Sequence, residues 1–221
     1  MYSKHKQEVI KAQFPVLYHG SDERVISMPE EERKEFLSSC WKIAEYVWQY
    51  VQPFATTNDL ARFKDYMSEH RYKVFCLGVS IYYHSRCLEN PLFEYDALYL
   101  TSFEDEAWRY AHRAHYFGEA GFVAYAMTCA ALSRGLELTL DESMSRMMDR
   151  VVAFAEGPRR PVVIAVDQYD PDLLKTETGE ELIMSKGVIQ GSNFRYLGKL
   201  QLNTFPTQER NDRVLSEPWL L

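Results

Sequence analysis

The amino-acid sequence predicts an α+β fold with a small β-sheet core and several inserted helices. Short apolar runs of strand length are spread along the chain, and the last three follow one another near the C-terminus. Between the runs, apolar residues recur at intervals of three and four, as on one face of a helix. Unevenly mixed strands and helices without an internal repeat are typical of an α+β domain. The expected strands cover residues 14–18, 72–83, 96–101, 161–166, 181–184, 187–190 and 194–202.

Length and composition predict one folded domain spanning residues 1–221. A chain of 221 residues with 46% hydrophobic and 26% charged residues is large enough for one core. We expect helical insertions at about 28–70 and 119–156 and a polar tail from about residue 207. No apolar run reaches the roughly 18 residues of a membrane span, and Met1–Gln13 lacks the apolar segment of a secretory leader. The expectation is a cytoplasmic protein that does not interact with membranes.

The charge and the cysteine spacing argue against a nucleic-acid-binding protein and against a protein held together by disulfides or metal. A net charge of −7 gives no overall attraction to nucleic acid, although local basic patches remain possible. The four cysteines show no C-x-x-C spacing, so neither a disulfide framework nor a thiolate metal site is expected. His112 and His115 share a helical face but lack a third ligand, and His84 to Cys87 is expected to be a loop. We therefore predict no metal.

The N-terminal half carries two expected helices before the strand at 72–83. Ser27 and Glu30 match a capping box, and the apolar stripe that follows is expected to end at Pro53. Thr57 or Asn58 is expected to cap a shorter helix that ends near Glu69. The apolar run Tyr72–Tyr83 is rich in aromatic and β-branched residues, so we predict a strand or a pair of strands, with a bulge or bend at Gly78.

Three further helices and a buried strand are expected in the second half. Ser102 and Asp105 supply a cap for a helix over Phe103–Phe117, and Gly121–Leu132 is apolar enough to be a central helix. Asp141 is expected to cap a third helix, which ends before Gly157. The continuous apolar run 161–166 predicts a strand buried on both faces, and the polar stretch 167–179 predicts a loop.

Three of the expected strands carry residues suited to chemistry. The strand that begins at Phe14 leads to His19, which is followed by Gly20, a residue that lets the backbone approach another group closely. The second strand contains Tyr99 and runs into Ser102 at the start of a helix. The third begins with an acidic pair that includes Glu181. Histidine, tyrosine and glutamate thus each belong to a short strand.

The three motifs, in this order, resemble the His-Tyr-Glu pattern of the ADP-ribosyltransferase superfamily. The matching segments are Leu17-Tyr18-His19-Gly20-Ser21, Leu98-Tyr99-Leu100-Thr101 and Glu181-Leu182-Ile183. The resemblance implies a split small sheet and the use of NAD as co-substrate. His19 and Gly20 would hold NAD with Ser102 beside them, Tyr99 would stack on nicotinamide, and Glu181 would drive the transfer of ADP-ribose. The interval between the first two motifs is longer than the resemblance implies, so helices are expected to be inserted there.

The expected reaction needs a carboxylate at the reacting centre. When the C1′–N bond of NAD breaks, positive charge develops on the ribose, and a carboxylate can stabilise that charge or accept the proton of the acceptor. Glu180 precedes Glu181, and because side chains alternate along a strand only one of them can face a cleft. We favour Glu181. Gly179 stands where arginine-modifying members have a second glutamate, which disfavours an arginine acceptor.

The resulting hypothesis is an NAD-dependent mono-ADP-ribosyltransferase that modifies an intracellular macromolecule, a protein or a nucleic acid, as a toxin or phage-defence effector. An antitoxin or another regulatory protein is a possible partner. Two alternatives stay open, namely an RNA 2′-phosphotransferase that uses NAD and an inactive protein-interaction domain. Motifs of Rossmann, P-loop, serine-hydrolase and zincin sites do not occur in the sequence.

Overall fold

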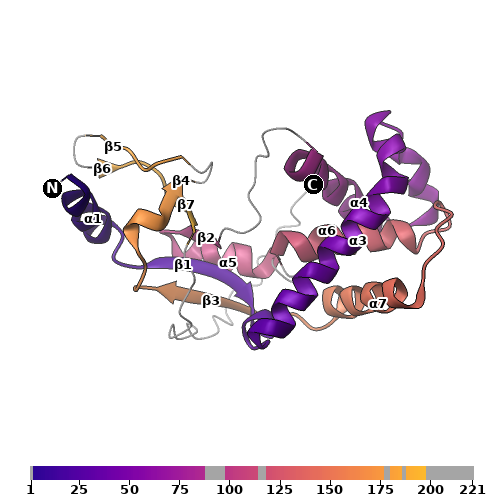
Figure 1. The fold of residues 1–221 in the computed structure, drawn as a ribbon, viewed down its shortest axis with the longest axis horizontal. Helices are drawn as coiled ribbons and strands as arrows, with labels where there is room; N and C mark the ends of the chain where they lie inside the picture. Colours follow the sequence, from indigo (N-terminus) through magenta and orange to yellow (C-terminus); the bar gives the residue numbers. More distant parts are fainter. Residues whose placement is uncertain (1, 88–97, 114–117, 177–179, 186–187, 198–221) are drawn as a thin grey trace. The chain divides into compact units, whose positions relative to one another are not determined.

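The computed structural model describes residues 2–87, 98–113, 118–176, 180–185 and 188–197. The chain divides into two compact units, both visible in Figure 1. We call them the sheet unit, which holds the described residues of 2–23, 98–113 and 160–197, and the helical unit, which holds those of 24–87 and 118–159. The helical insertions expected at about 28–70 and 119–156 both fall in the helical unit.

The sheet unit is built on a five-stranded antiparallel sheet with the strand order β3-β1-β2-β7-β4. A two-stranded sheet made of β5 and β6 accompanies it. The chain is thus a mixture of helices and antiparallel sheet, as the expected α+β class requires. The strands are β1 Leu17–Asp22, β2 Leu98–Thr101, β3 Pro161–Val166, β4 Leu174–Thr176, β5 Met184–Ser185, β6 Val188–Ile189 and β7 Asn193–Tyr196.

Helix α5 (Glu104–Arg113) covers one face of β1 and β3. Its buried Ala107, Trp108 and Ala111 pack with Val163 of β3, and Tyr18 of β1 packs against this cluster. Three acidic residues in the first turn favour the positive end of the helix dipole. This helix therefore fixes the position of the β1 motif.

Helix α1 (Tyr2–Gln13) and the residue after it fasten the N-terminus to the rest of the sheet unit. The Gln13 amide donates to the carbonyl of Ile189 at 2.7 Å and accepts from its N–H at 2.8 Å. The ring of Phe14 meets that of Phe194 edge to face, with centroids 4.9 Å apart. The polar start of the chain thus forms a docked helix, for which the sequence pattern predicted no structure.

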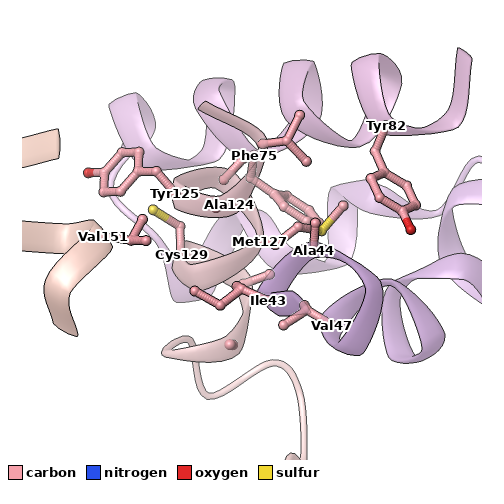
Figure 2. Packing of buried hydrophobic residues seen from close by; sticks show 14 of the residues in the cluster. Ile43, Ala44, Val47, Phe75, Tyr82, Ala124, Tyr125, Met127, Cys129 and Val151 are labelled. Carbon is pink, nitrogen blue, oxygen red and sulfur yellow. The ribbon is translucent and has the colours of Figure 1, made fainter. Parts of the chain in front are cut away.

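The core of the helical unit is formed by α3 (Glu30–Thr56), α4 (Glu69–Tyr82), α6 (Gly118–Ala131) and α7 (Glu142–Glu156), together with Phe63 of the 3₁₀ helix η1 (Figure 2). Helix α6 is buried almost all round, and it contacts α3, α4 and α7. In Figure 2, Ala124 and Met127 of α6 lie among side chains of α3 and α4. The helices of the unit are α3 Glu30–Thr56, the 3₁₀ helix η1 Leu60–Tyr66, α4 Glu69–Tyr82, the π-helical turn η2 Tyr83–Cys87, α6 Gly118–Ala131 and α7 Glu142–Glu156. The short α2 Glu23–Ile26 precedes them.

The strand structure predicted over Tyr72–Tyr83 is wrong, because residues 72–82 belong to helix α4 and Tyr83 begins the π-helical turn η2. The side chain of Ser68 caps the helix by accepting from the N–H of Arg71. A Cβ on Gly78 would lie 2.2 Å from that of Ala126, so this glycine allows α4 and α6 to approach closely. Gly78 marks a helix contact rather than a bulge. The expected loop at His84 to Cys87 is the π-helical turn.

Two details of the first long helix also differ from the prediction. Helix α3 begins at Glu30 after Pro29, and no side chain caps it, so the capping box at Ser27 does not form. The helix continues through Pro53 to Thr56 instead of ending there. The second helix is the shorter 3₁₀ helix η1, which begins after Asp59. Asn58 has a φ of 57°, a left-handed conformation, and lies between the two helices.

Several expectations in the second half are confirmed. Asp141 caps α7 by accepting from the N–H of Met144 at 2.7 Å, and Gly157 follows the last turn. The run 161–166 is a strand, although β3 lies at a sheet edge instead of in the middle. The prediction of a loop over 167–179 is wrong for residues 171–176, which form the 3₁₀ helix Pro171–Leu173 and strand β4. The tail from about residue 207 lies outside the described residues.

No helix in the described part of the chain is long and apolar enough to cross a membrane. The same residues contain no group of three or more His, Cys, Asp or Glu side chains that could hold a metal ion. His112 belongs to α5, whereas His115 lies outside the described residues.

Candidate functional site

His19 lies where strands β1 and β2 separate. The two strands share one registered pair, Tyr18 with Thr101, whereas β1 is paired with β3 along its whole length. The next expected pairs, His19 with Leu100 and Gly20 with Tyr99, are not part of the ladder. Instead, Nδ1 of His19 lies 2.9 Å from the carbonyl oxygen of Tyr99. The imidazole therefore links two of the sequence motifs at the point where the sheet opens.

The environment of His19 determines its protonation. Burial lowers the pKa of the imidazole, and the hydrogen bond to the Tyr99 carbonyl opposes this effect only in part. The ring is therefore neutral at pH 7. A carbonyl can only accept a hydrogen bond, so Nδ1 carries the proton and Nε2 keeps its lone pair. His19 thus presents a hydrogen-bond acceptor, which suits a ligand hydroxyl.

Gly20 is required by the packing of helix α5. A Cβ at this position would lie 2.0 Å from the carbonyl oxygen of Ala107 and 2.5 Å from the backbone nitrogen of Ala111. Both are backbone atoms, so no side-chain rotation would relieve the clash. The absence of a side chain at Gly20 thus has a structural cause that is independent of any ligand.

Tyr99 lies in β2 opposite Arg195 of β7, and directly opposed residues in antiparallel strands share a face of the sheet. Tyr99 is half-buried, while Arg195 is 3% exposed. A buried guanidinium therefore belongs to the same face of the sheet as the tyrosine. Ser102 is half-buried just beyond β2, where its N–H donates to the carbonyl of Ser192 at 2.8 Å.

A carboxylate that the sequence motifs did not include lies at the end of β2. Glu106 of α5 accepts a hydrogen bond from the hydroxyl of Thr101 at 3.2 Å and another from the Nδ2 of Asn193 at 3.3 Å. The Thr101 hydroxyl in turn accepts from the N–H of Phe103. This network ties the first turn of α5 to β2 and β7. In the sequence, the only signal that Glu106 belongs to this site is its position soon after the tyrosine motif.

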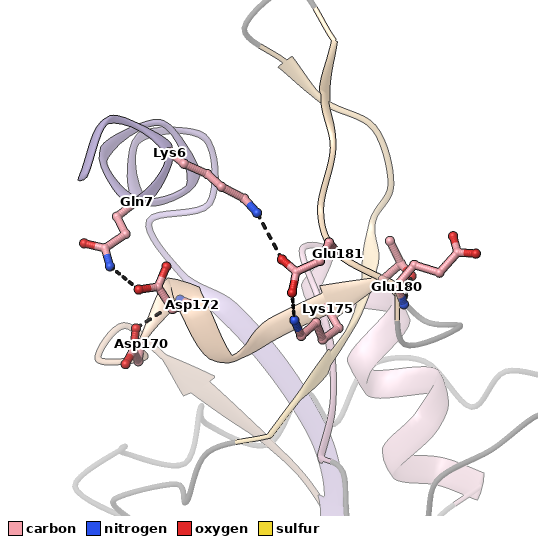
Figure 3. A network of polar contacts seen from close by, with 8 residues as sticks. Lys6, Gln7, Asp170, Asp172, Lys175, Glu180 and Glu181 are labelled. Carbon is pink, nitrogen blue, oxygen red and sulfur yellow. Dashed lines mark hydrogen bonds and ion pairs between the residues drawn. The ribbon is translucent and has the colours of Figure 1, made fainter. Parts of the chain in front are cut away.

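Glu181 is held by two lysines at the outer edge of the sheet (Figure 3). It forms an isolated bridge with Lys175 of β4, and its carboxylate forms ion pairs with Lys175 and, at 3.2 Å, with Lys6 of α1. Its side chain is 68% exposed. The side chain of Glu180 points away from this pair in Figure 3, as strand alternation predicts.

The structure brings together two of the three motifs. The imidazole of His19 contacts the backbone carbonyl of Tyr99, Gly20 follows His19 in the chain, and Ser102 lies three residues after Tyr99. The registered pair of Tyr18 with Thr101 places the Tyr99 side chain on the face of Tyr18, opposite to that of His19. Glu181 is separated from His19 by β2, β7 and β4 in the sheet order. At about 4.8 Å per strand, four steps amount to roughly 19 Å along the sheet. The strand expected over 181–184 is also reduced to Met184 and Ser185 of β5.

Comparison with known proteins adds no assignment: no family model, no curated protein sequence and no solved structure matches this chain.

Proposed function

We propose that this chain is an NAD-dependent mono-ADP-ribosyltransferase that transfers ADP-ribose to a macromolecule. The observation that carries the proposal is the contact between His19 and the backbone of Tyr99 where β1 and β2 separate. His19 and Tyr99 are 80 residues apart in the sequence, and each belongs to a motif that resembles this superfamily. They meet where two antiparallel strands separate. The resemblance assigns both of them to NAD binding.

The resemblance suggests a role for each residue in such a reaction. The Nε2 of His19 would accept a hydrogen bond from a ribose hydroxyl of NAD, since its Nδ1 proton is used by Tyr99. The Tyr99 ring would stack on nicotinamide, with the charge of Arg195 on the same face of the sheet. Gly20 would keep only a backbone role, because helix α5 fills the space where its side chain would be.

In the transfer step, a nucleophilic atom of the acceptor bonds to C1′ of the nicotinamide ribose while the C1′–N bond breaks. Nicotinamide leaves with the electron pair of that bond, and the proton of the acceptor passes to a carboxylate. Glu181 is the carboxylate that the resemblance assigns to this role. In the structure this carboxylate forms ion pairs with Lys6 and Lys175.

The proposal includes a role for the protein in the cell. By its resemblance to compact intracellular members of the superfamily, the chain would act as a toxin or phage-defence effector. An antitoxin or another regulatory protein would then be its partner.

Purified protein tests the enzymatic part directly. Incubated with NAD, it should release nicotinamide slowly even without an acceptor, because water can take the acceptor's place; chromatography measures the product. A host lysate labelled with tagged NAD and then digested with protease or nuclease identifies the acceptor class. If the protein does not bind NAD at millimolar concentration, the enzyme proposal is wrong and an interaction domain becomes the better hypothesis.

A further inference from the structure

A hollow of about 240 Å³ lies at the surface of the helical unit. Its wall is formed by the start of α4, by α6, and by the end of α7 with the residues that follow it. Most of the side chains in this wall are polar, namely those of Ser68, His70, Arg71, Tyr125, Glu156 and Arg159.

One part of the wall is an ion pair supported by a tyrosine. The Nη2 of Arg71 lies 2.5 Å from Oε1 of Glu156, and the hydroxyl of Tyr125 donates to the same oxygen at 2.7 Å. The bond from Tyr125 and the pairing with Arg71 lower the pKa of Glu156, so the carboxylate is ionised at pH 7 and balances the charge of Arg71. Both side chains of the ion pair are 42% exposed, so a ligand in the hollow can reach them. A guanidinium has N–H groups on its other nitrogens, which lets Arg71 bind a second acceptor.

The remaining polar residues of the wall make the hollow positively charged. Arg159 is exposed, and no described residue forms an ion pair with it. The hydroxyl of Ser68 accepts a hydrogen bond from the N–H of Arg71 at 3.3 Å, and its own proton can be donated to a ligand. His70 adds an imidazole. Since Glu156 balances only Arg71, the charge of Arg159 is in excess, although the whole chain has a net charge of −7.

We propose that this hollow binds a phosphate group, which Arg71 and Arg159 hold by charge-assisted hydrogen bonds. A tetrahedral phosphate offers oxygens to donors that approach from several sides, whereas the oxygens of a carboxylate lie in one plane. The volume is below the usual range for drug-sized ligands, so it suits inorganic phosphate or a small phosphate ester rather than a whole dinucleotide. The site belongs to the helical unit and does not rest on the proposed function.

Calorimetry with inorganic phosphate tests the site, at low ionic strength so that exposed charges are little screened. The wild-type protein should bind phosphate saturably, and Arg159→Gln should weaken binding about tenfold or more because charge-assisted hydrogen bonds are lost. Arg159→Lys, which keeps the charge but loses the paired donors, should weaken it less. Arg134→Gln is the matched control, since Arg134 is an exposed arginine of the same unit outside the hollow. No saturable binding at millimolar phosphate, or equal affinities of wild-type protein and Arg159→Gln, would overturn the proposal.

Two glutamates of α7 provide a test in the opposite direction. The carboxylate of Glu156 repels a phosphate in the hollow, so Glu156→Gln should tighten binding about threefold or more. Glu142 is paired with Arg146 at 2.5 Å in a similar way but does not line the hollow, so Glu142→Gln should leave the affinity unchanged within about twofold. Equal tightening by both variants would mean that phosphate responds only to the overall charge, which would overturn the site.

Competing ligands identify the chemical class and its source. Sulfate, which is also tetrahedral, should displace phosphate, whereas acetate at the same concentration should not. Equal displacement by acetate would overturn the assignment to a phosphate group. Ribose 5-phosphate is titrated alongside inorganic phosphate. Tighter binding of the ester assigns the site to a phosphate monoester, and equal or weaker binding assigns it to free phosphate.

Discussion

Gly20→Ala separates the structural role of the first motif from its proposed role in binding NAD. The added Cβ would meet the Ala107 carbonyl oxygen at 2.0 Å and the Ala111 nitrogen at 2.5 Å, both far inside van der Waals contact. Overpacking typically costs about 1–3 kcal/mol, and because backbone atoms must move here we expect a loss of about 3 kcal/mol or more. With a urea dependence of about 1–3 kcal/mol per molar, the unfolding midpoint should fall by roughly 1–3 M.

Urea unfolding followed by circular dichroism measures this loss. Ser21→Ala is the matched control, since it changes the next residue of β1 without adding an atom, and it should cost less than about 1 kcal/mol. NAD binding by the folded fraction is measured alongside. If Gly20→Ala lowers the stability by less than about 1 kcal/mol and abolishes NAD binding, the packing explanation is wrong and a direct role of Gly20 beside nicotinamide is favoured.

Three further predictions concern single residues. Tyr99→Ala should weaken NAD binding about fivefold or more through lost stacking, measured by calorimetry, whereas a large loss of thermal stability with unchanged affinity would assign the ring to the core. Asp141→Ala should cost about 1 kcal/mol in urea unfolding, because it removes the bond to the Met144 N–H; an unchanged midpoint would contradict the cap. Because burial lowers the pKa of His19, the unfolded chain binds this proton more tightly than the folded chain does. The free energy of unfolding should therefore be at its full value above pH 6.5, the ordinary pKa, and fall as the pH drops below it. His19→Gln should show a smaller fall in stability between about pH 7.5 and 5.5, and an equal fall would contradict this role.

Local sequence signals predicted the elements whose patterns were unambiguous. Asp141 caps α7, the apolar segment that begins at Gly121 lies in the buried helix α6, and the run 161–166 is a strand. The strand prediction for Tyr72–Tyr83 failed because the β-branched and aromatic residues of this segment favour a strand locally, while packing against α6 selects the helix. The meaning of Gly78 depended on Ala126 of α6, a partner that no local pattern reveals.

The candidate site was predictable only in part for the same reason. Strand-end signals identified His19 and Tyr99, which the structure places in contact. Glu106 and Asn193 come from different elements and meet only through the pairing of β2 with β7, so their hydrogen bond left no trace in the local sequence. The lysine partners of Glu181 come from α1 and β4, and the docking of α1 was not predicted.

Nicotinamide release from NAD by wild-type protein, Glu181→Gln and Glu180→Gln tests the central claim most directly. Glutamine keeps the size of the side chain but removes the charge that favours the oxocarbenium ion, so Glu181→Gln should lower the rate by roughly a hundredfold or more with little change in NAD affinity. Glu180→Gln, whose side chain points away, should retain activity. The reverse result would mean that the catalytic carboxylate is the neighbouring residue. Full activity of both variants, or no release by the wild-type protein, would contradict the assignment of the third motif to an ADP-ribosyltransferase site.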